Sequence, residues 1–247
     1  MIKVAIMGFG TIGSGVAEVL DINKKSIAAR VGDEVELKYV LDLRDFEGDP
    51  IQEKIVHDYK VIAEDPEVAI VVETMGGVEP ARTYIVQALE AGKQVVTANK
   101  DVLAEHGQEI LSLAENSGCD IQFEAAVAGA IPIIRPLKQS LAGSMLTEIM
   151  GIVNGTTNYM LTKMSEEGMD YKEALAKATE LGYAEADPTA DVEGYDAGRK
   201  IAIMSSLAFN SKVTFKDVYM EGITKITSDD IRYAKEFGYV IKLLGVT

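Results

Sequence analysis

Short apolar runs alternate with longer segments of helical period along the first half of the chain. The runs typical of strands lie at 2–7 (IKVAIM), 35–42, 68–74, 94–98 and 120–126. Between them, apolar residues recur at helical spacing over about 11–30, 80–92 and 100–116. Strands and helices in this alternation form a parallel sheet that is covered on both faces, so we predict an α/β fold for this part.

The alternation stops after Gly129. There we expect a helix entered through Pro132, a strand over 145–154, and helices over about 155–166, 171–182 and 191–209. This pattern predicts a separate α+β domain, residues 130–234, after a first domain of residues 1–129. The final run, EFGYVIKLLGVT, is strand-like again. We interpret it as an edge strand or as the end of a shortened chain, and we expect residues 235–247 to return to the first domain.

A glycine-rich turn joins the first predicted strand to the first predicted helix. It reads Gly8-Phe9-Gly10-Thr11-Ile12-Gly13, which is a GxGxxG. Gly8 permits the tight turn, Gly10 lets the backbone approach a pyrophosphate, and Gly13 lets helix and strand pack closely. The helix N-terminus, with Thr11 and Ile12, then offers amide donors to the anion. The sequence therefore predicts a Rossmann-type, doubly wound parallel sheet that binds a dinucleotide.

The second predicted strand ends at Asp42, where a carboxylate is expected to accept the ribose 2′-OH of NAD. Arg44 follows two residues later and can hold the 2′-phosphate of NADP, although a solvated loop cation is an equal alternative. The choice between NAD and NADP therefore stays open.

Charge and cysteine content exclude several other classes of protein. The net charge is −15, and no Lys/Arg run is long enough to follow a phosphate backbone, so we expect no nucleic-acid partner. No apolar run reaches the roughly 18 to 20 residues of a membrane helix. Cys119 is the single cysteine and no signal peptide precedes the first strand, which predicts a cytoplasmic protein. With His57 and His106 as the only histidines, a zinc site of the usual kind is not expected.

Polar residues and glycines follow the third and fourth predicted strands, at the sheet edge where ligands of this architecture bind. We assign to the cofactor site the residues Thr74, Gly76, Thr97, Asn99 and Lys100.

Taken together, several stretches of the chain resemble the homoserine dehydrogenase family. The resemblance rests on six stretches in the family's order: GFGTIGSGV (8–16), VVETMGG (71–77), VVTANKDVLAEHG (95–107), FEAAVAGAIPII (123–134), GIVNGTTNYML (151–161) and GYAEADPTADVEGYDAGRK (182–200). It implies reversible, NAD(P)-dependent oxidation of L-homoserine to L-aspartate 4-semialdehyde, on the way to threonine and methionine. It also implies a homodimer and a second domain that binds substrate and dimerises.

Oxidation of an alcohol needs a base beside the hydroxyl and a cation for the developing alkoxide charge. Lys100 and Lys200 are the candidates, in positions that the family associates with catalysis. Two neighbouring ammonium groups would depress the pKa of one of them, which makes a division into base and electrostatic stabiliser reasonable. The alternative for Lys200 is an ordinary exposed i,i+4 ion pair with Asp196, worth about 0.3–0.5 kcal/mol.

The resemblance also supplies substrate and cation ligands. Glu185 and Asp196 would bind substrate, with Asp191 nearby, Gly155 and Thr156 facing the substrate carboxylate, and Tyr183 either lining the site or packed. A monovalent cation, Na⁺ or K⁺, would be held mainly by carbonyl groups of Glu124, Val127, Gly129 and Ile131.

Departures from the family keep two alternatives open. Alanines 128 and 130 stand where the family often has glycine, and the chain stops before the regulatory ACT domain that many members carry. One alternative is another Rossmann oxidoreductase acting on an amino-acid aldehyde or alcohol, for which Cys119 would be the thioester nucleophile; we interpret Cys119 as structural. The other is a non-catalytic dinucleotide-binding module that dimerises through residues 145–154.

Overall fold

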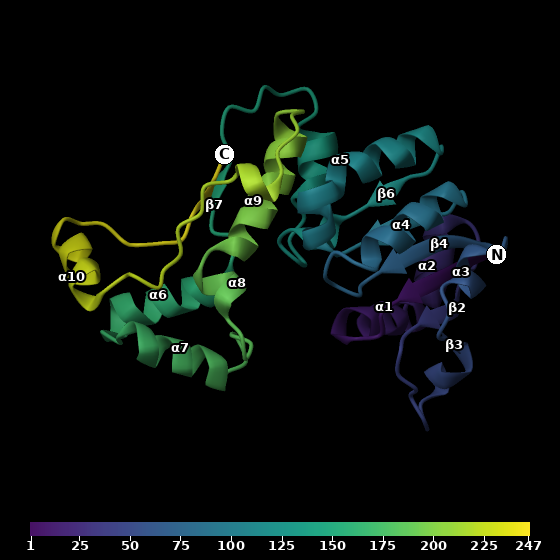
Figure 1. Cartoon of the computed structure of the whole chain (residues 1–247), viewed down its shortest axis with the longest axis horizontal. Coiled ribbons are helices and arrows are strands. Elements are labelled where there is room, and N and C mark those ends of the chain that lie inside the picture. The colour runs from purple at the N-terminus through teal and green to yellow at the C-terminus, as the bar shows by residue number, and fades with distance from the viewer. The chain divides into compact units, whose positions relative to one another are not determined.

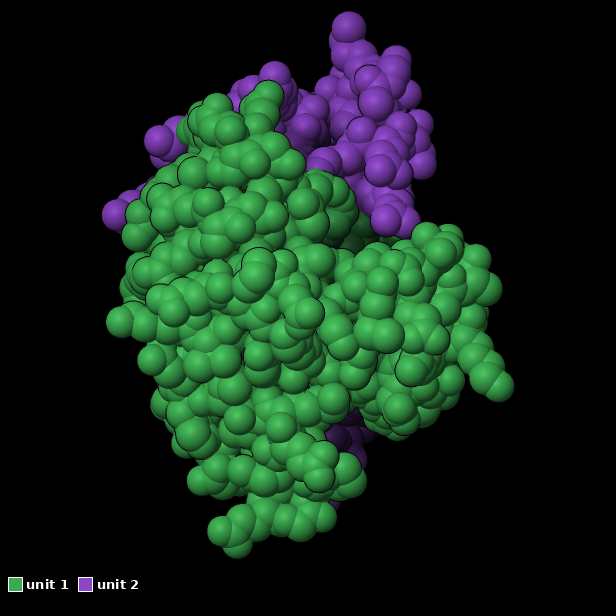
Figure 2. Space-filling view, turned by 90° about the vertical axis from the view of Figure 1, so that its right-hand side faces the viewer, with its two compact units in different colours: residues 1–133 green, residues 134–247 purple.

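The computed structural model describes all residues, 1–247. The chain forms two compact units, Met1–Ile133 and Ile134–Thr247, which are coloured separately in Figure 2. The boundary lies four residues beyond the predicted one. None of the helices combines the length and apolar character that crossing a membrane requires.

Unit 1 is built on a six-stranded sheet in the order β3-β2-β1-β4-β5-β6. All neighbouring strands are parallel. This is the strand order of a doubly wound dinucleotide-binding fold, and it confirms the predicted fold class. The strands are β1 (Ile2–Met7), β2 (Val35–Leu41), β3 (Ile55–Val56), β4 (Val68–Glu73), β5 (Gln94–Thr97) and β6 (Ile121–Gln122).

Helices flank this sheet (Figure 1). They are α1 (Thr11–Ile22), α2 (Lys24–Val31), α3 (Lys60–Ala63), α4 (Ala81–Glu90) and α5 (Lys100–Asn116), with a short 3-10 turn at Pro50–Lys54. Central β1 is buried on both faces: Val4 and Ile6 join an apolar cluster that includes Val16 and Leu20 of α1, while Ala5 and Met7 are fully buried as well. Burial on both faces explains why these strands read as continuous apolar runs.

Two elements of unit 1 differ from the prediction. The helix expected over 11–30 is interrupted at Asn23, where φ of −98° and ψ of 12° leave helical geometry between α1 and α2. The strand expected over 120–126 ends at Gln122, and Glu124–Ala126 form a 3-10 turn. Apolar spacing alone contains no signal for either interruption.

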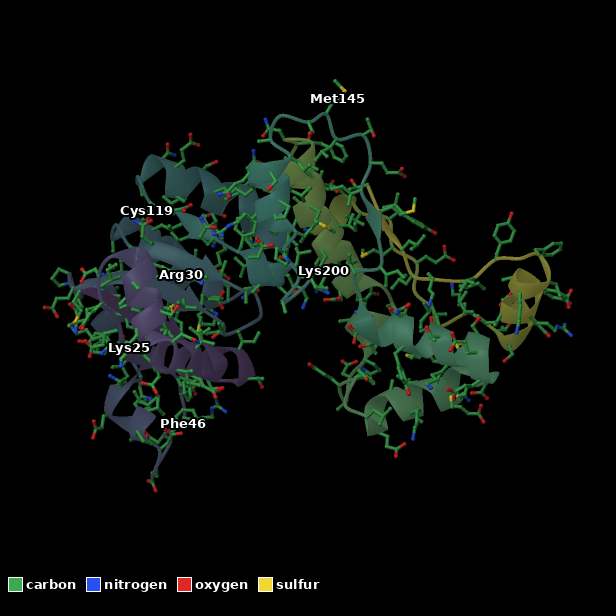
Figure 3. The ribbon with its side chains drawn as sticks, turned by 180° about the vertical axis from the view of Figure 1, so that it is seen from behind. Lys25, Arg30, Phe46, Cys119, Met145 and Lys200 are labelled. Carbon is green, nitrogen blue, oxygen red and sulfur yellow. The ribbon has the colours of Figure 1, made fainter.

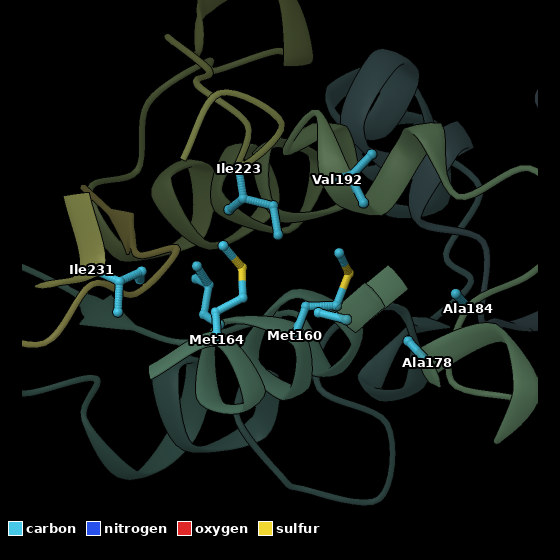
Figure 4. Close-up of a cluster of buried hydrophobic side chains, with 9 residues drawn as sticks. Met160, Met164, Ala178, Ala184, Val192, Ile223 and Ile231 are labelled. Carbon is cyan, nitrogen blue, oxygen red and sulfur yellow. The ribbon is translucent and has the colours of Figure 1, made fainter. Parts of the chain in front are cut away.

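Unit 2 consists mainly of helices: α6 (Gly155–Glu167), α7 (Tyr171–Glu180), α8 (Thr189–Val192), α9 (Tyr195–Ala208) and α10 (Ser228–Glu236), with a 3-10 turn at Phe215–Asp217. Its apolar core surrounds Met160 and Met164 of α6, against which α7 and α10 contribute Ala178 and Ile231 (Figure 4). The helix predicted over 191–209 is divided at Gly194, whose φ of 82° is left-handed. The helix α10 was not predicted.

The β structure of unit 2 is smaller than predicted. In place of a strand over 145–154, only β7 (Met150–Gly151) forms, paired antiparallel with β8 (Gly245–Val246). The helix expected after Pro132 is a single π turn at Pro136–Ser140. The predicted return of residues 235–247 to the first domain is not seen, because β8 pairs within unit 2 and Gly245 packs so closely that an added Cβ would lie 2.6 Å from Ile201.

Candidate cofactor and substrate sites

The turn between β1 and α1 has the close packing that its glycines predict. Gly8 adopts a left-handed φ of 92° and its N–H donates to the Leu41 carbonyl at 2.8 Å. A Cβ on Gly13 would lie 2.0 Å from the Gly8 carbonyl oxygen. Gly10 is the N-cap of α1 and provides no side-chain cap, so the first amides of the helix are left for a ligand.

Thr74 follows β4 and supports this turn from the neighbouring strand. Its hydroxyl lies 2.9 Å from the Gly8 carbonyl and 3.1 Å from that of Met7. The Thr74 side chain, predicted to contact the cofactor, therefore holds the backbone that surrounds the predicted pyrophosphate site.

Asp42 and Arg44 form an ion pair just after the end of β2. Arg44 donates from Nε to one Asp42 carboxylate oxygen at 2.9 Å and from its terminal nitrogen to the other at 3.0 Å. The Phe9 amide also donates to Asp42, at 2.8 Å. The Arg44 guanidinium lies over the Phe46 ring, 5.1 Å from its centre. The structure thus brings both residues that bear on the NAD/NADP choice to one position beside the glycine turn.

The side-chain hydrogen bonds from Arg44 hold the pKa of the Asp42 carboxyl well below its usual value of 3.8. A carboxyl whose pKa is lower in the folded state stabilises the fold above its ordinary pKa, and this stabilisation is lost as the pH falls toward the folded value. We therefore expect Asp42→Asn to be less stable than the unmodified chain at neutral pH and to approach it between about pH 4 and pH 2 in thermal melts. Asp21→Asn, at an exposed position of α1 without an ion pair, is the control and should show no such convergence. A constant difference across this range would contradict the assignment.

A fully buried carboxylate, Glu73, lies at the end of β4 and was missed by sequence reasoning. The Thr97 hydroxyl donates to it at 2.6 Å, the Met75 amide at 2.8 Å, and the Asn99 side chain at 3.4 Å. Asn99 also donates to the Gly77 carbonyl at 2.7 Å. The side chains of Thr97 and Asn99, predicted to bind cofactor, are thus buried in a network that fixes the loop after β4.

Lys100 is half-buried and is the first residue of α5, directly after the N-cap Asn99. The Asn99 side chain caps the helix by accepting from the Val102 amide. Gly76, in the loop after β4, takes a left-handed φ of 77° and is therefore a position that favours glycine. Lys100 and Gly76 thus lie at the carboxyl ends of neighbouring strands, as predicted.

In unit 2, Asp191 of α8, Asp196 of α9 and Lys200 of α9 meet around Asn154. Asn154 donates to Asp191 at 2.7 Å and to Asp196 at 2.9 Å. Lys200 donates to Asp196 at 2.6 Å and to the Val153 carbonyl at 2.7 Å. The ion pair is shielded, with 17% of the Lys200 side chain and 8% of the Asp196 side chain exposed. It is therefore no ordinary solvent-facing helix pair; Figure 3 marks Lys200.

The other predicted substrate ligands have different interaction partners. The Thr156 hydroxyl donates to the Tyr183 carbonyl at 2.7 Å, and the Tyr183 ring stacks on Tyr159 with 4.7 Å between ring centres. Gly155 opens α6 and is exposed, as is Glu185, which makes no ion pair. Glu185 and the Gly155 amide are therefore accessible to a ligand, whereas the Thr156 hydroxyl already donates its hydrogen to the Tyr183 carbonyl.

The predicted cation loop contains two strained alanines. Ala128 and Ala130 adopt left-handed φ angles of 51° and 66°, a region that costs a residue with a Cβ about 1–2 kcal/mol. The Ile131 amide donates to the Ala128 carbonyl at 2.8 Å, and the Glu124 carboxylate accepts from the Ile133 amide at 2.6 Å. The carbonyls of Val127 and Gly129 lie in the same turn. No group of three or more His, Cys, Asp or Glu side chains is arranged to hold a metal ion, so a cation here would depend on carbonyl ligands.

The sheet order, the glycine turn and the acid at the end of β2 define unit 1 as a dinucleotide-binding domain of the Rossmann type. Comparison with known proteins agrees. The family model described as "Homoserine dehydrogenase, NAD binding domain" matches residues 8–124, and the model described as "Homoserine dehydrogenase" matches residues 132–247. The chain therefore belongs to the homoserine dehydrogenase family.

Several individual proteins are similar to the chain over nearly all of its length. The homoserine dehydrogenase of Bacillus subtilis is 46% identical over 249 residues, which cover 99% of this chain and 57% of the relative. A solved homoserine dehydrogenase from Thiobacillus denitrificans matches with a TM-score of 0.94 at 42% identity, over 99% of this chain and 57% of that one. A putative homoserine dehydrogenase from Archaeoglobus fulgidus matches with a TM-score of 0.89 at 35% identity, over 100% and 80%.

A further solved structure, a hyperthermophilic archaeal homoserine dehydrogenase in complex with NADPH, matches with a TM-score of 0.82 at 26% identity, over 100% of this chain and 78% of that one. The chain spans a little over half the length of the curated relatives that it matches.

Proposed function

We propose that the chain carries out the reversible, NAD(P)-dependent interconversion of L-homoserine and L-aspartate 4-semialdehyde, a step of threonine and methionine biosynthesis. The observation that carries the proposal is the shielded Lys200–Asp196 pair, bound to Asn154, in a chain of this family. A lysine held in a fixed position away from bulk solvent is placed to exchange a proton with a substrate hydroxyl.

We assign the residues of the chain to separate roles in the reaction. The glycine turn and the first amides of α1 hold the pyrophosphate, and the nicotinamide supplies hydride transfer when it is bound. The Lys200 ammonium makes two hydrogen bonds in the chain and carries three hydrogens, so in the reduction direction one N–H is left to give its proton to the semialdehyde oxygen. In the oxidation direction the neutral Lys200 amine takes up the proton of the substrate hydroxyl, and Lys100 is proposed to stabilise the alkoxide charge. Glu185, with Asp191 nearby, is proposed to bind the substrate ammonium.

The direct test is an assay of the purified chain and of a version extended to the length of its relatives. We expect absorbance at the NAD(P)H band to rise when L-homoserine is added with NAD⁺ or NADP⁺, and to fall in the reverse reaction with the semialdehyde. Absence of turnover with either cofactor in the extended protein would reject the proposal.

Cofactor choice is proposed to depend on Arg44. A 2′-phosphate would compete with Asp42 for the guanidinium, whereas a free 2′-OH can be accepted by Asp42. We expect Arg44→Ala to weaken NADPH binding by about tenfold, the loss of one charge-assisted contact, with little change for NADH. Titration of the two cofactors by their fluorescence measures this ratio. Arg82→Ala, which removes an ion pair with Glu109 on α5, is the matched control. Equal losses for both cofactors would contradict the role in selection.

Three further properties are proposed with their tests. A monovalent cation would bind to the carbonyls of the 124–131 loop, and added K⁺ or Na⁺ should then raise thermal stability at constant ionic strength.

A homodimer would form through the apolar residues on β7 and β8, because Met150 and Val246 are 58% and 48% exposed. Light scattering after gel filtration decides the oligomeric state. A cytoplasmic location is also proposed, from the single cysteine, and fractionation of cells tests it.

A further inference from the structure

Asn154 occupies an unusual position, because it caps a helix and contacts two carboxylates at once. It is the N-cap of α6, and its side-chain oxygen accepts from the Thr157 amide at 2.9 Å and from the Thr157 hydroxyl at 2.8 Å. These two donors fix which end of the amide is oxygen. The nitrogen must therefore face the other way, toward Asp191 and Asp196. Asn154 and Thr157 are both buried, so the arrangement is shielded from water.

The amide nitrogen has two hydrogens, and each of them meets one carboxylate. Asp191 and Asp196 lie on different helices, α8 and α9, separated by the left-handed Gly194. The shared nitrogen brings one oxygen of each acid within about 5.6 Å of the other, the sum of its two hydrogen-bond lengths of 2.7 and 2.9 Å. Carboxylates at this separation repel in a shielded site, and a donor between them offsets that repulsion.

The residue before Asn154 holds the lysine of the same network. The Val153 carbonyl accepts from Lys200 at 2.7 Å. Two consecutive residues in the segment that enters α6 thus fix the ammonium and both acids, while α6 itself is anchored in the core of unit 2 through Met160 and Leu161. The network is therefore attached to a packed helix.

The side-chain amide of Asn154 is uncharged, and this preserves the net charge of the groups around it. Asp191, Asp196 and Lys200 carry together one net negative charge. Lysine or arginine at position 154 would satisfy the acids but cancel that charge, whereas an amide binds both acids and preserves it. A site with this balance attracts the ammonium of an amino-acid substrate.

We propose that Asn154 is a positioning residue: it sets the separation and orientation of Asp191 and Asp196, and through Asp196 that of Lys200, for an α-amino-acid substrate. The proposal rests on the proposed function, since it concerns the same site.

The test replaces Asn154 with serine, which keeps a good N-cap acceptor but removes both N–H donors. We expect kcat/KM for L-homoserine to fall about 10- to 100-fold, by analogy with the loss of a hydrogen-bond partner that orients a metal ligand. The loss should appear in both kcat, through Asp196 and Lys200, and KM, through Asp191, while the affinity for NAD(P)H stays unchanged. Asp170→Ser is the matched control, because Asp170 is the N-cap of α7 and its side chain caps that helix without contacting this network.

A double-mutant cycle separates positioning from general destabilisation. If Asn154 acts through Asp191, the loss in Asn154→Ser should be smaller in an Asp191→Asn background, because the two changes affect the same interaction. Additive losses would overturn the proposal, as would an Asn154→Ser protein with wild-type kcat and KM. If the serine variant does not fold, Asn154→Gly, which is tolerated at an N-cap and removes both donors without adding a charge, gives the same decision. An inactive wild type would instead reject the proposed function itself.

Discussion

Replacement of Lys200 by alanine is expected to lower turnover of L-homoserine about 10²- to 10⁴-fold, the contribution of a positioned proton-transfer group. Binding of NAD(P)H should be retained, because the glycine turn and the Asp42–Arg44 pair belong to unit 1 and Lys200 belongs to unit 2. The substitution also leaves the shielded Asp196 carboxylate without its ammonium, so a lower melting temperature is expected. Asn154 still donates to Asp196, and the variant should therefore remain folded below that temperature.

The measurement combines steady-state turnover, cofactor titration and a thermal melt. Lys163→Ala is the matched control, because Lys163 forms another i,i+4 ion pair in the same unit, with Glu167, and 29% and 46% of the two side chains are exposed. Such a pair contributes about 0.3–0.5 kcal/mol, so this variant should retain activity and stability. Normal turnover in Lys200→Ala would exclude Lys200 from catalysis. A protein that only senses the dinucleotide would have no turnover to lose.

Gly13→Ala is expected to disrupt the cofactor domain. The added Cβ would lie 2.0 Å from the Gly8 carbonyl oxygen and 2.9 Å from the Thr74 hydroxyl. The first contact is with backbone in a tight turn, so relief requires α1 to move away from β1. Overpacking of this kind costs about 1–3 kcal/mol, which corresponds to about 2–4 °C in melting temperature for each kcal/mol. We also expect NAD(P)H affinity to fall at least about tenfold, because the helix amides shift relative to the pyrophosphate.

Gly15→Ala provides a control on the same helix. A Cβ at this position meets nothing within 4 Å, and alanine favours a helix interior by about 1 kcal/mol over glycine. The two substitutions should therefore change the melting temperature in opposite directions. If Gly13→Ala binds NAD(P)H as tightly as the unmodified chain, close packing at Gly13 is unnecessary for the cofactor site.

The features predicted correctly from the sequence are those that depend on the order of residues within a single helix, strand or turn. The strand runs of unit 1, the GxGxxG before α1, and the helix bounded by Pro80 and Gly92 each depend on residues within one element. The parallel order of the sheet then follows from their alternation. Family resemblance supplied the acids and lysine of residues 182–200, which spacing alone does not distinguish from a solvated helix face.

The features missed depend on contacts between distant segments. Glu73 reads as one acid at the end of an apolar strand, and its burial becomes visible only when Thr97 and Asn99 lie beside it. Asn154 reads as an N-cap, and its second role requires Asp191 and Asp196, which lie 37 and 42 residues later. The pairing of β7 with β8 joins residues 150–151 to 245–246, and no local pattern specifies that register.

The Glu73 network has a consequence for how this part of the chain can vary. Thr97 donates to Glu73 and also accepts from the Asn99 amide at 2.9 Å, so its hydroxyl has a fixed direction. A change of Glu73 alone to an apolar residue would leave the buried Thr97 hydroxyl without its acceptor, whereas matched changes of Glu73 and Thr97 would remove this donor and this acceptor together. Positions 73 and 97 are thus expected to change together among descendants of this sequence, independently of the residues proposed to contact the substrate.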